Sequence, residues 1–92
     1  MNEKQRELAR HALGLPNSKN FTYRNYFCTG RDTEHYSEWQ GLVDQKMAVK
    51  REMGPEWCGD YFYLTLKAAK EVLLPHEHIS REDAAKMREL SV

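Results

Sequence analysis

The sequence predicts a single small α+β domain of three main helices, a β-hairpin and a short C-terminal helix. Apolar residues recur at helical spacing in residues 3–13 and again between 32 and 47, which indicates two amphipathic helices. An alternating run at 47–52 and an apolar run at 61–64 predict a hairpin around a Gly- and Pro-rich loop. A chain of 92 residues is long enough for one modest core.

The first third holds one clear element and one ambiguous one. Gly14 and Pro16 follow the helix expected at residues 3–13 and predict its end. The aromatic stretch 21–28 alternates like a strand at its beginning, yet its later aromatic residues are spaced like one helical turn. So short a run fits both structures, and both remain open.

The second helix is expected from Asp32 to about Lys46. Asp32 or Thr33 can cap it, and its apolar stripe includes Trp39 and Leu42. Gly41 lies inside this helix at a cost of about 1 kcal/mol relative to Ala, so we expect another element to pack closely against it.

The remaining elements follow from capping signals. Thr65 is expected to cap a third helix that ends before Pro75. Ser80 and Asp83 resemble a capping box and open a short helix to residue 90. The apolar face of this last helix is thin, so we expect residues 1–79 to form the domain and residues 80–92 a loosely docked addition.

Several features of the sequence indicate a cytoplasmic protein. The N-terminus lacks the apolar stretch of a secretory signal, and no segment approaches the roughly 20 apolar residues of a membrane span. Cys28 and Cys58 are too few for a disulfide framework and are expected to be reduced thiols. We therefore expect no contact with a membrane.

Charge is balanced overall but unevenly distributed. Fourteen Lys and Arg residues face fourteen Asp and Glu residues. Residues 1–31 carry a net charge of +4, whereas residues 32–60 carry −4. A balanced domain has no global field that collects polyanions, so nucleic-acid binding would need a local basic face.

The sequence from Gly41 to Leu73 resembles the second half of a winged-helix domain. That half has a helix ending in Leu-Val, a basic strand, a wing and a Tyr-x-Leu-Thr strand leading into a helix; the matching segments here are Leu42-Val43, Val49-Lys50-Arg51, residues 54–60 and Phe62-Tyr63-Leu64-Thr65. The resemblance implies a winged-helix-like fold. Winged-helix domains usually have Gly where this chain has Lys46 and Ala68, and the short helix that precedes the recognition helix of a helix-turn-helix could only come from residues 21–30.

The chain as a whole is also similar to small bacteriophage and prophage proteins that have no assigned activity. The shared feature is the Arg-Asn-aromatic stretch Arg24–Phe27 before Gly30, followed by a helix and the hairpin. The resemblance implies a small accessory protein.

The charge of the second helix favours a protein partner over DNA. From Asp32 to Lys46 this helix carries a net charge of −3, although its place in the winged-helix pattern is that of the DNA-reading helix. Phosphates would repel such a helix. We therefore predict a protein-interaction module, or a homodimer, that uses Trp57 at the hairpin tip and Glu34 and Glu38 on the acidic helix. Trp57 could instead fold back onto the core, because Trp is on average highly buried.

The alternative is a nucleic-acid-binding regulator. Its candidate contacts are Lys19, Arg24, Arg31, Lys50 and Arg51. The first three are interleaved with the aromatic residues of the stretch 21–28. Basic residues among aromatic ones can follow the phosphates of a nucleic-acid strand while the rings stack on its bases. The same rings could instead fill the core of a domain with few aliphatic residues.

We expect no metal, no cofactor and no enzymatic activity. The potential ligands Cys28, His35, Cys58, His76 and His78 lack the paired spacing of structural zinc sites. No Gly-rich phosphate loop is present. A cysteine nucleophile needs a histidine beside it, which Cys28 and His35 could provide only by an accident of the fold.

Overall fold

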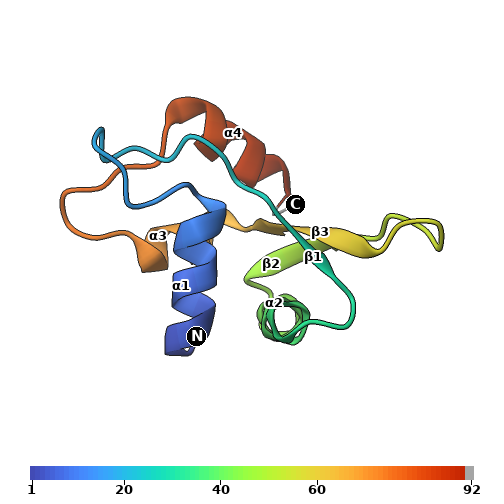
Figure 1. The fold of residues 1–92 in the computed structure, drawn as a ribbon. Helices are drawn as coiled ribbons and strands as arrows, with labels where there is room; N and C mark the ends of the chain where they lie inside the picture. The colour runs from blue at the N-terminus through green and yellow to red at the C-terminus, as the bar shows by residue number, and fades with distance from the viewer. Residues whose placement is uncertain (91–92) are drawn as a thin grey trace.

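The protein forms an α+β fold in which four helices surround a three-stranded antiparallel sheet (Figure 1). The computed structural model describes residues 1–90. In chain order the elements are α1 (Glu3–Ala12), β1 (Phe27–Gly30), α2 (Glu34–Asp44), β2 (Ala48–Arg51), β3 (Gly59–Leu64), α3 (Leu66–Val72) and α4 (Arg81–Leu90). The α+β class, the hairpin of β2 and β3, and the helix capped by Thr65 are confirmed.

The sheet contains a third strand that the hairpin prediction did not include. Its order is β1-β3-β2, with Phe27 opposite Phe62 and Val49 opposite Tyr63. The stretch 21–28 is therefore extended and enters a strand, and its helical interpretation is wrong. Asn25 shows why: its side-chain amide exchanges two hydrogen bonds of 2.9 Å with the backbone of Leu64, which continues the ladder beyond β1.

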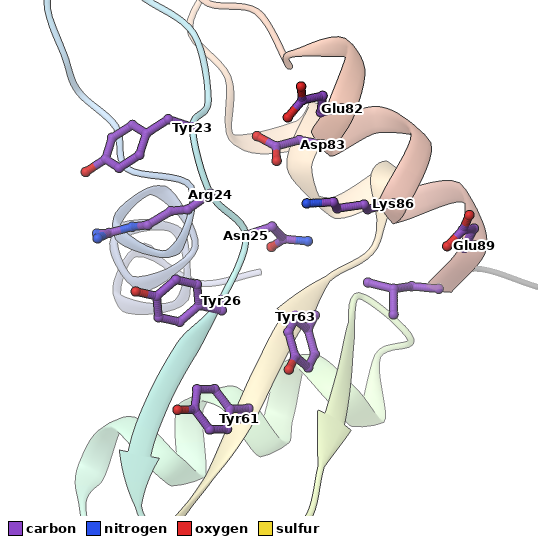
Figure 2. A pocket seen from close by; sticks show the side chains of 11 residues that line it. Tyr23, Arg24, Asn25, Tyr26, Tyr61, Tyr63, Glu82, Asp83, Lys86 and Glu89 are labelled. Carbon is purple, nitrogen blue, oxygen red and sulfur yellow. The ribbon is translucent and has the colours of Figure 1, made fainter.

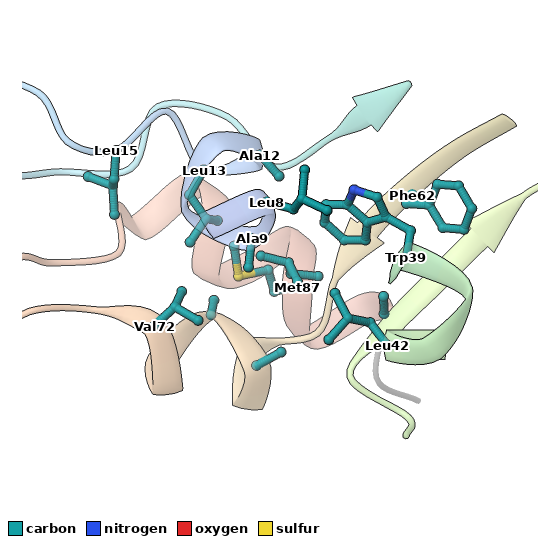
Figure 3. Close-up of a cluster of buried hydrophobic side chains, with 14 residues drawn as sticks. Leu8, Ala9, Ala12, Leu13, Leu15, Trp39, Leu42, Phe62, Val72 and Met87 are labelled. Carbon is teal, nitrogen blue, oxygen red and sulfur yellow. The ribbon is translucent and has the colours of Figure 1, made fainter. Parts of the chain in front are cut away.

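The core lies between the sheet and helices α1, α2 and α3 (Figure 3). Trp39 of α2 stacks on Phe62 of β3 with ring centroids 5.6 Å apart, and both side chains are completely buried. Gly41 faces α1, where a Cβ atom would lie 2.7 Å from the side-chain amide of Gln5. The close packing expected at this glycine is therefore present.

The two faces of β3 have different surroundings. Asp60, Phe62 and Leu64 are buried on the face that α1 and α2 cover. Tyr61 and Tyr63 are half-buried on the opposite face, where they share a groove with residues of α4 (Figure 2). The alternation of side chains along a strand thus separates a closed inner face from an open outer one.

Helix α4 is attached through buried contacts. Met87 is fully buried in the core, although the predicted apolar face of this helix is thin. The capping box is only half formed: Ser80 Oγ accepts the amide of Asp83 at 3.2 Å, but the Asp83 carboxylate accepts the hydroxyl of Thr22 at 2.6 Å instead. Thr22 Oγ1 in turn accepts the amide of Ser80 at 3.0 Å, so one buried threonine joins residues 20–22 to the start of α4.

Candidate functional site

The tip of the β2–β3 hairpin is the loop of residues 52–58, and it presents an exposed tryptophan. The ring of Trp57 is 53% exposed, so it does not fold back onto the core. Its backbone is ordered by a turn in which the Trp57 amide donates to the carbonyl of Gly54 at 3.2 Å. The tip projects beyond the rest of the sheet (Figure 1), where it is accessible to a partner.

Arg31, which follows β1, holds the backbone of this tip. Its Nη1 donates to the carbonyl of Trp57 at 2.6 Å and its Nη2 to the carbonyl of Gly54 at 3.1 Å. These two bonds tie both sides of the loop to one guanidinium. Arg31 is therefore occupied by its own chain and is not free to contact phosphate.

Asp60 anchors Arg31 from the inner face of β3. The buried carboxylate forms a two-pronged pair with Arg31, with distances of 3.2 Å to Nε and 2.8 Å to Nη2. It also accepts the hydroxyl of Tyr36 at 2.7 Å and the amide of Met53 at 3.0 Å. The Arg31 guanidinium, followed by these two donors, holds the pKa of Asp60 well below its usual range. The carboxylate is thus charged at neutral pH and fixes the tip to the sheet.

The two predicted acidic residues bond to side chains at the N-terminal end of α1. Their helix α2 lies apart from the hairpin tip (Figure 1). Glu34 pairs with Lys4 at 2.8 Å, and this bond lowers the pKa of Glu34. Glu38 accepts the side-chain amide of Asn2 at 3.3 Å. Glu34 nevertheless remains largely solvent-exposed, so its carboxylate stays at the surface of the helix beside Lys4.

The structure does not gather the five predicted nucleic-acid contacts into one free basic face. Arg31 is clamped as described above, Arg24 donates to the carbonyl of His11 at 2.7 Å, and Lys50 donates to Gln40 at 3.0 Å. Of the five, only Lys19 and Arg51 have exposed side chains without a polar partner within residues 1–90. These two lie in different elements, one in the α1–β1 connection and one in β2.

A groove lined by tyrosines lies between α4 and the outer face of the sheet (Figure 2). Its volume is about 730 Å³. Four of the chain's five tyrosines line it. The lining residues are Tyr23, Arg24, Asn25, Tyr26, Tyr61, Tyr63, Glu82, Asp83, Lys86, Glu89 and Leu90. Such a concentration makes this groove the second candidate site.

Two of these tyrosines are held in place by the arginine between them. The Arg24 guanidinium lies 5.3 Å from the ring centroid of Tyr23 and 5.9 Å from that of Tyr26. Tyr23 also covers Gly14, which has φ +79°, and a Cβ atom there would overlap the ring. The wall of the groove is therefore shaped before any ligand arrives.

The exposure of these rings corrects one interpretation of the aromatic stretch. Phe21, Tyr23 and Tyr26 are about half exposed or more, so they do not fill the core; Phe27 alone packs against it. Tyr61 and Tyr63 were not predicted to be surface residues. The signal was available, because tyrosine alternates with phenylalanine and leucine from residue 61 to 64, as in a strand with one buried face.

Residues 1–90 contain neither a metal-binding cluster nor a membrane-spanning helix. No three His, Cys, Asp or Glu side chains in this range are grouped so that they could hold a metal ion. Within the same residues, no helix has the length and apolar character to cross a membrane. Both cysteines are free and exposed.

Comparisons with known proteins return no match. No protein-family model, curated protein or solved structure matches this chain. What the chain does must therefore be inferred from its own surface, of which the hairpin tip and the tyrosine-lined groove are the two most distinctive parts.

Proposed function

We propose that this chain is a non-catalytic protein-interaction module, of the phage or prophage accessory kind, that binds a polypeptide partner through its hairpin tip. One observation carries this proposal: Trp57 is exposed on a loop whose backbone is fixed by Arg31 and the buried Asp60. Tryptophan is enriched among the residues that dominate interface energies. A loop already fixed in place loses little entropy on binding, so the ring acts as a preorganised anchor.

The charge and the connectivity around α2 support a polypeptide partner. The exposed carboxylates of this helix would repel phosphate. The hairpin follows α2 and leads directly into α3, which supports a winged-helix-like arrangement. Residues 21–30 form a bridge, coil and β1, so a helix-turn-helix reader would lack the helix it needs before α2 in the described chain.

A site-specific cross-link tests the proposal. A photoreactive phenylalanine derivative in place of Trp57, which keeps an aromatic ring at the tip, is expected to give a discrete protein adduct in the cells that express this chain, or a dimer of the chain itself. The matched control is the same substitution at Leu74, which is 48% exposed on the connection between α3 and α4. Adducts from position 57 and none from position 74 would support the proposal.

Two results would contradict the proposal. Equal adducts from both positions, or none, would contradict a role for the tip. Retention on random duplex DNA that falls steeply with salt, and is lost on Lys19→Glu with Arg51→Glu, would replace the proposal with the regulator alternative.

A further inference from the structure

A second, separate surface points to a particular kind of ligand. We propose that the tyrosine-lined groove binds an extended, proline-rich peptide that carries a basic residue. None of the residues that line this groove belongs to the hairpin tip. The inference therefore goes beyond the proposed role of Trp57 and can fail independently of it.

The rings match the apolar part of such a ligand. Tyr26 and Tyr61 pair across the floor with centroids 6.3 Å apart, and Tyr63 continues the row toward α4 (Figure 2). Proline-rich segments in the polyproline II conformation dock into aromatic-lined grooves, because their rings pack between aromatic side chains and their backbone is already extended. Tyrosine suits such a contact, since it offers a large rigid ring at low entropic cost.

The polar atoms of the groove also fit this backbone. In the described chain, the hydroxyls of the four lining tyrosines have no hydrogen-bond partner, whereas the hydroxyl of Tyr36 outside the groove is bound to Asp60. The ammonium group of Lys86 extends into the groove (Figure 2) and likewise has no partner among residues 1–90. These groups can donate hydrogen bonds. A polyproline backbone presents carbonyl acceptors and, at each proline, no N–H donor.

The charge of the groove favours a cationic peptide over a nucleic acid. Three carboxylates and two cations line it, which gives a net charge of −1. Asp83 is engaged by Thr22, but Glu82 and Glu89 on α4 form no ion pair within residues 1–90. A lysine or arginine beside the prolines would complement these two carboxylates, whereas a polyanion would meet them unfavourably.

Titration of the labelled protein with a synthetic polyproline peptide that has an arginine at each end tests this proposal. We expect amide resonances of groove residues to shift, with saturation. The matched peptide with alanines in place of the prolines keeps the charge and is expected to give little shift. Tyr61→Ala should weaken binding roughly tenfold, equivalent to about 1.4 kcal/mol. Tyr63→Phe tests the hydroxyl alone and carries little risk of unfolding, because it keeps the ring.

Two further variants separate this proposal from the first. Glu82→Gln with Glu89→Gln should weaken binding of the arginine-flanked peptide roughly twofold to fivefold, the usual range for exposed ion pairs, and leave an uncharged polyproline peptide unaffected. Trp57→Ala should leave both titrations unchanged, while Tyr61→Ala should leave the cross-link at position 57 unchanged.

Three outcomes would overturn the proposal. No saturable shift at about 1 mM peptide, where binding would be worth only about 4 kcal/mol, would show that the groove is not a peptide site. Tighter, salt-sensitive binding of a single-stranded oligothymidylate at the same residues would assign the groove to nucleic acid. Shifts of the same residues on concentrating the protein alone would assign it to a second copy of this chain.

Discussion

Two arginine–carboxylate pairs connect segments that are distant in the sequence, and they connect different parts of the molecule. Arg10 of α1 reaches Glu77, whose side chain is 1% exposed, and ties the first helix to the connection before α4. Arg31 reaches Asp60, which is equally buried. The remaining N–H donors of Arg31, however, bind only backbone carbonyls of the hairpin tip. The same kind of ion pair therefore holds helices of the core together in one place and positions the loop of the exposed Trp57 in the other.

This difference predicts that breaking the first pair affects the whole fold, whereas breaking the second affects mainly the tip. Arg10 also donates to the carbonyl of Val72, and Glu77 also accepts the amide of Leu74, so α1, α3 and the following connection all meet at this pair. Around Arg31, the backbone acceptors are the carbonyls of Gly54, Trp57 and Gly59, which all lie within or beside the tip.

Glu77→Gln is expected to have the largest effect on stability. It leaves the Arg10 guanidinium largely buried without its counter-charge, and breaking a buried pair in this way costs about 3 kcal/mol or more. Urea unfolding followed by circular dichroism measures the loss. The control is Glu71→Gln, an exposed residue of α3 whose side chain forms no hydrogen bond or ion pair within residues 1–90; a similar loss in both variants would contradict the special role of this pair.

The same variant should change the acid response. The Arg10 guanidinium, with the Leu74 amide, lowers the pKa of Glu77 from 4.5 to about 2 despite its burial. An unfolded chain binds the proton more readily, so the stabilisation is complete above about pH 4.5 and is lost as the pH falls toward 2. Glu77→Gln should therefore flatten the fall in stability over this interval, and an unchanged acid profile would contradict the assignment.

Arg31→Met should act mainly on the tip, because the buried Asp60 carboxylate keeps two other donors, the hydroxyl of Tyr36 and the amide of Met53. It removes the donors that hold the carbonyls of Gly54 and Trp57, so amides of residues 53–58 should exchange faster while those of α1 keep their protection. Trp57 should also become easier to quench with acrylamide, since the only other tryptophan, Trp39, is fully buried. Arg51→Met is the control, an exposed arginine on the same hairpin. Uniform loss of protection across the fold would show that the two pairs do not differ in this way.

Thr22→Val tests whether a hydrogen-bonded contact that contains no ion pair stabilises the fold as the two arginine–carboxylate pairs do. It leaves the buried Asp83 carboxylate without its hydroxyl donor and the Ser80 amide without its acceptor, which together should cost about 2 kcal/mol. Exchange of α4 amides should rise first, because this contact joins α4 to the body. Thr22→Ser keeps the hydroxyl and should restore most of the protection; equal losses in both would mean that packing of the methyl group, and not the hydrogen bonds, holds the helix.

The sequence predicted the elements better than it predicted their partners. Helical spacing and caps placed α1, α2 and α3 within a few residues, because those signals are local. Pairing of β1 with β3 depends on residues more than 25 positions apart, such as Cys28 and Tyr61, and no local pattern encodes it. The roles of Arg31 and Arg24 were missed for the same reason: a charge pattern shows that a cation is present, but not that its own chain already occupies it.

Lys46 provides the smallest expected effect, at the opposite end of the hairpin from Trp57. It has φ +63° at the end of α2, where its amide bonds Val43 and the amide of Met47 bonds Leu42 at 2.8 Å. This is the helix-ending motif that favours glycine. Lys46→Gly should relieve the left-handed strain and stabilise the fold by about 1 kcal/mol, measured as a rise in the urea midpoint without a change in slope.

Gln45→Gly, one residue earlier at φ −85°, gains no such relief and should destabilise instead. If both glycines lowered the midpoint, the strain at Lys46 would be smaller than the entropy that glycine adds to the unfolded chain, and the base of the hairpin would owe its geometry to the packing of α2 against β2.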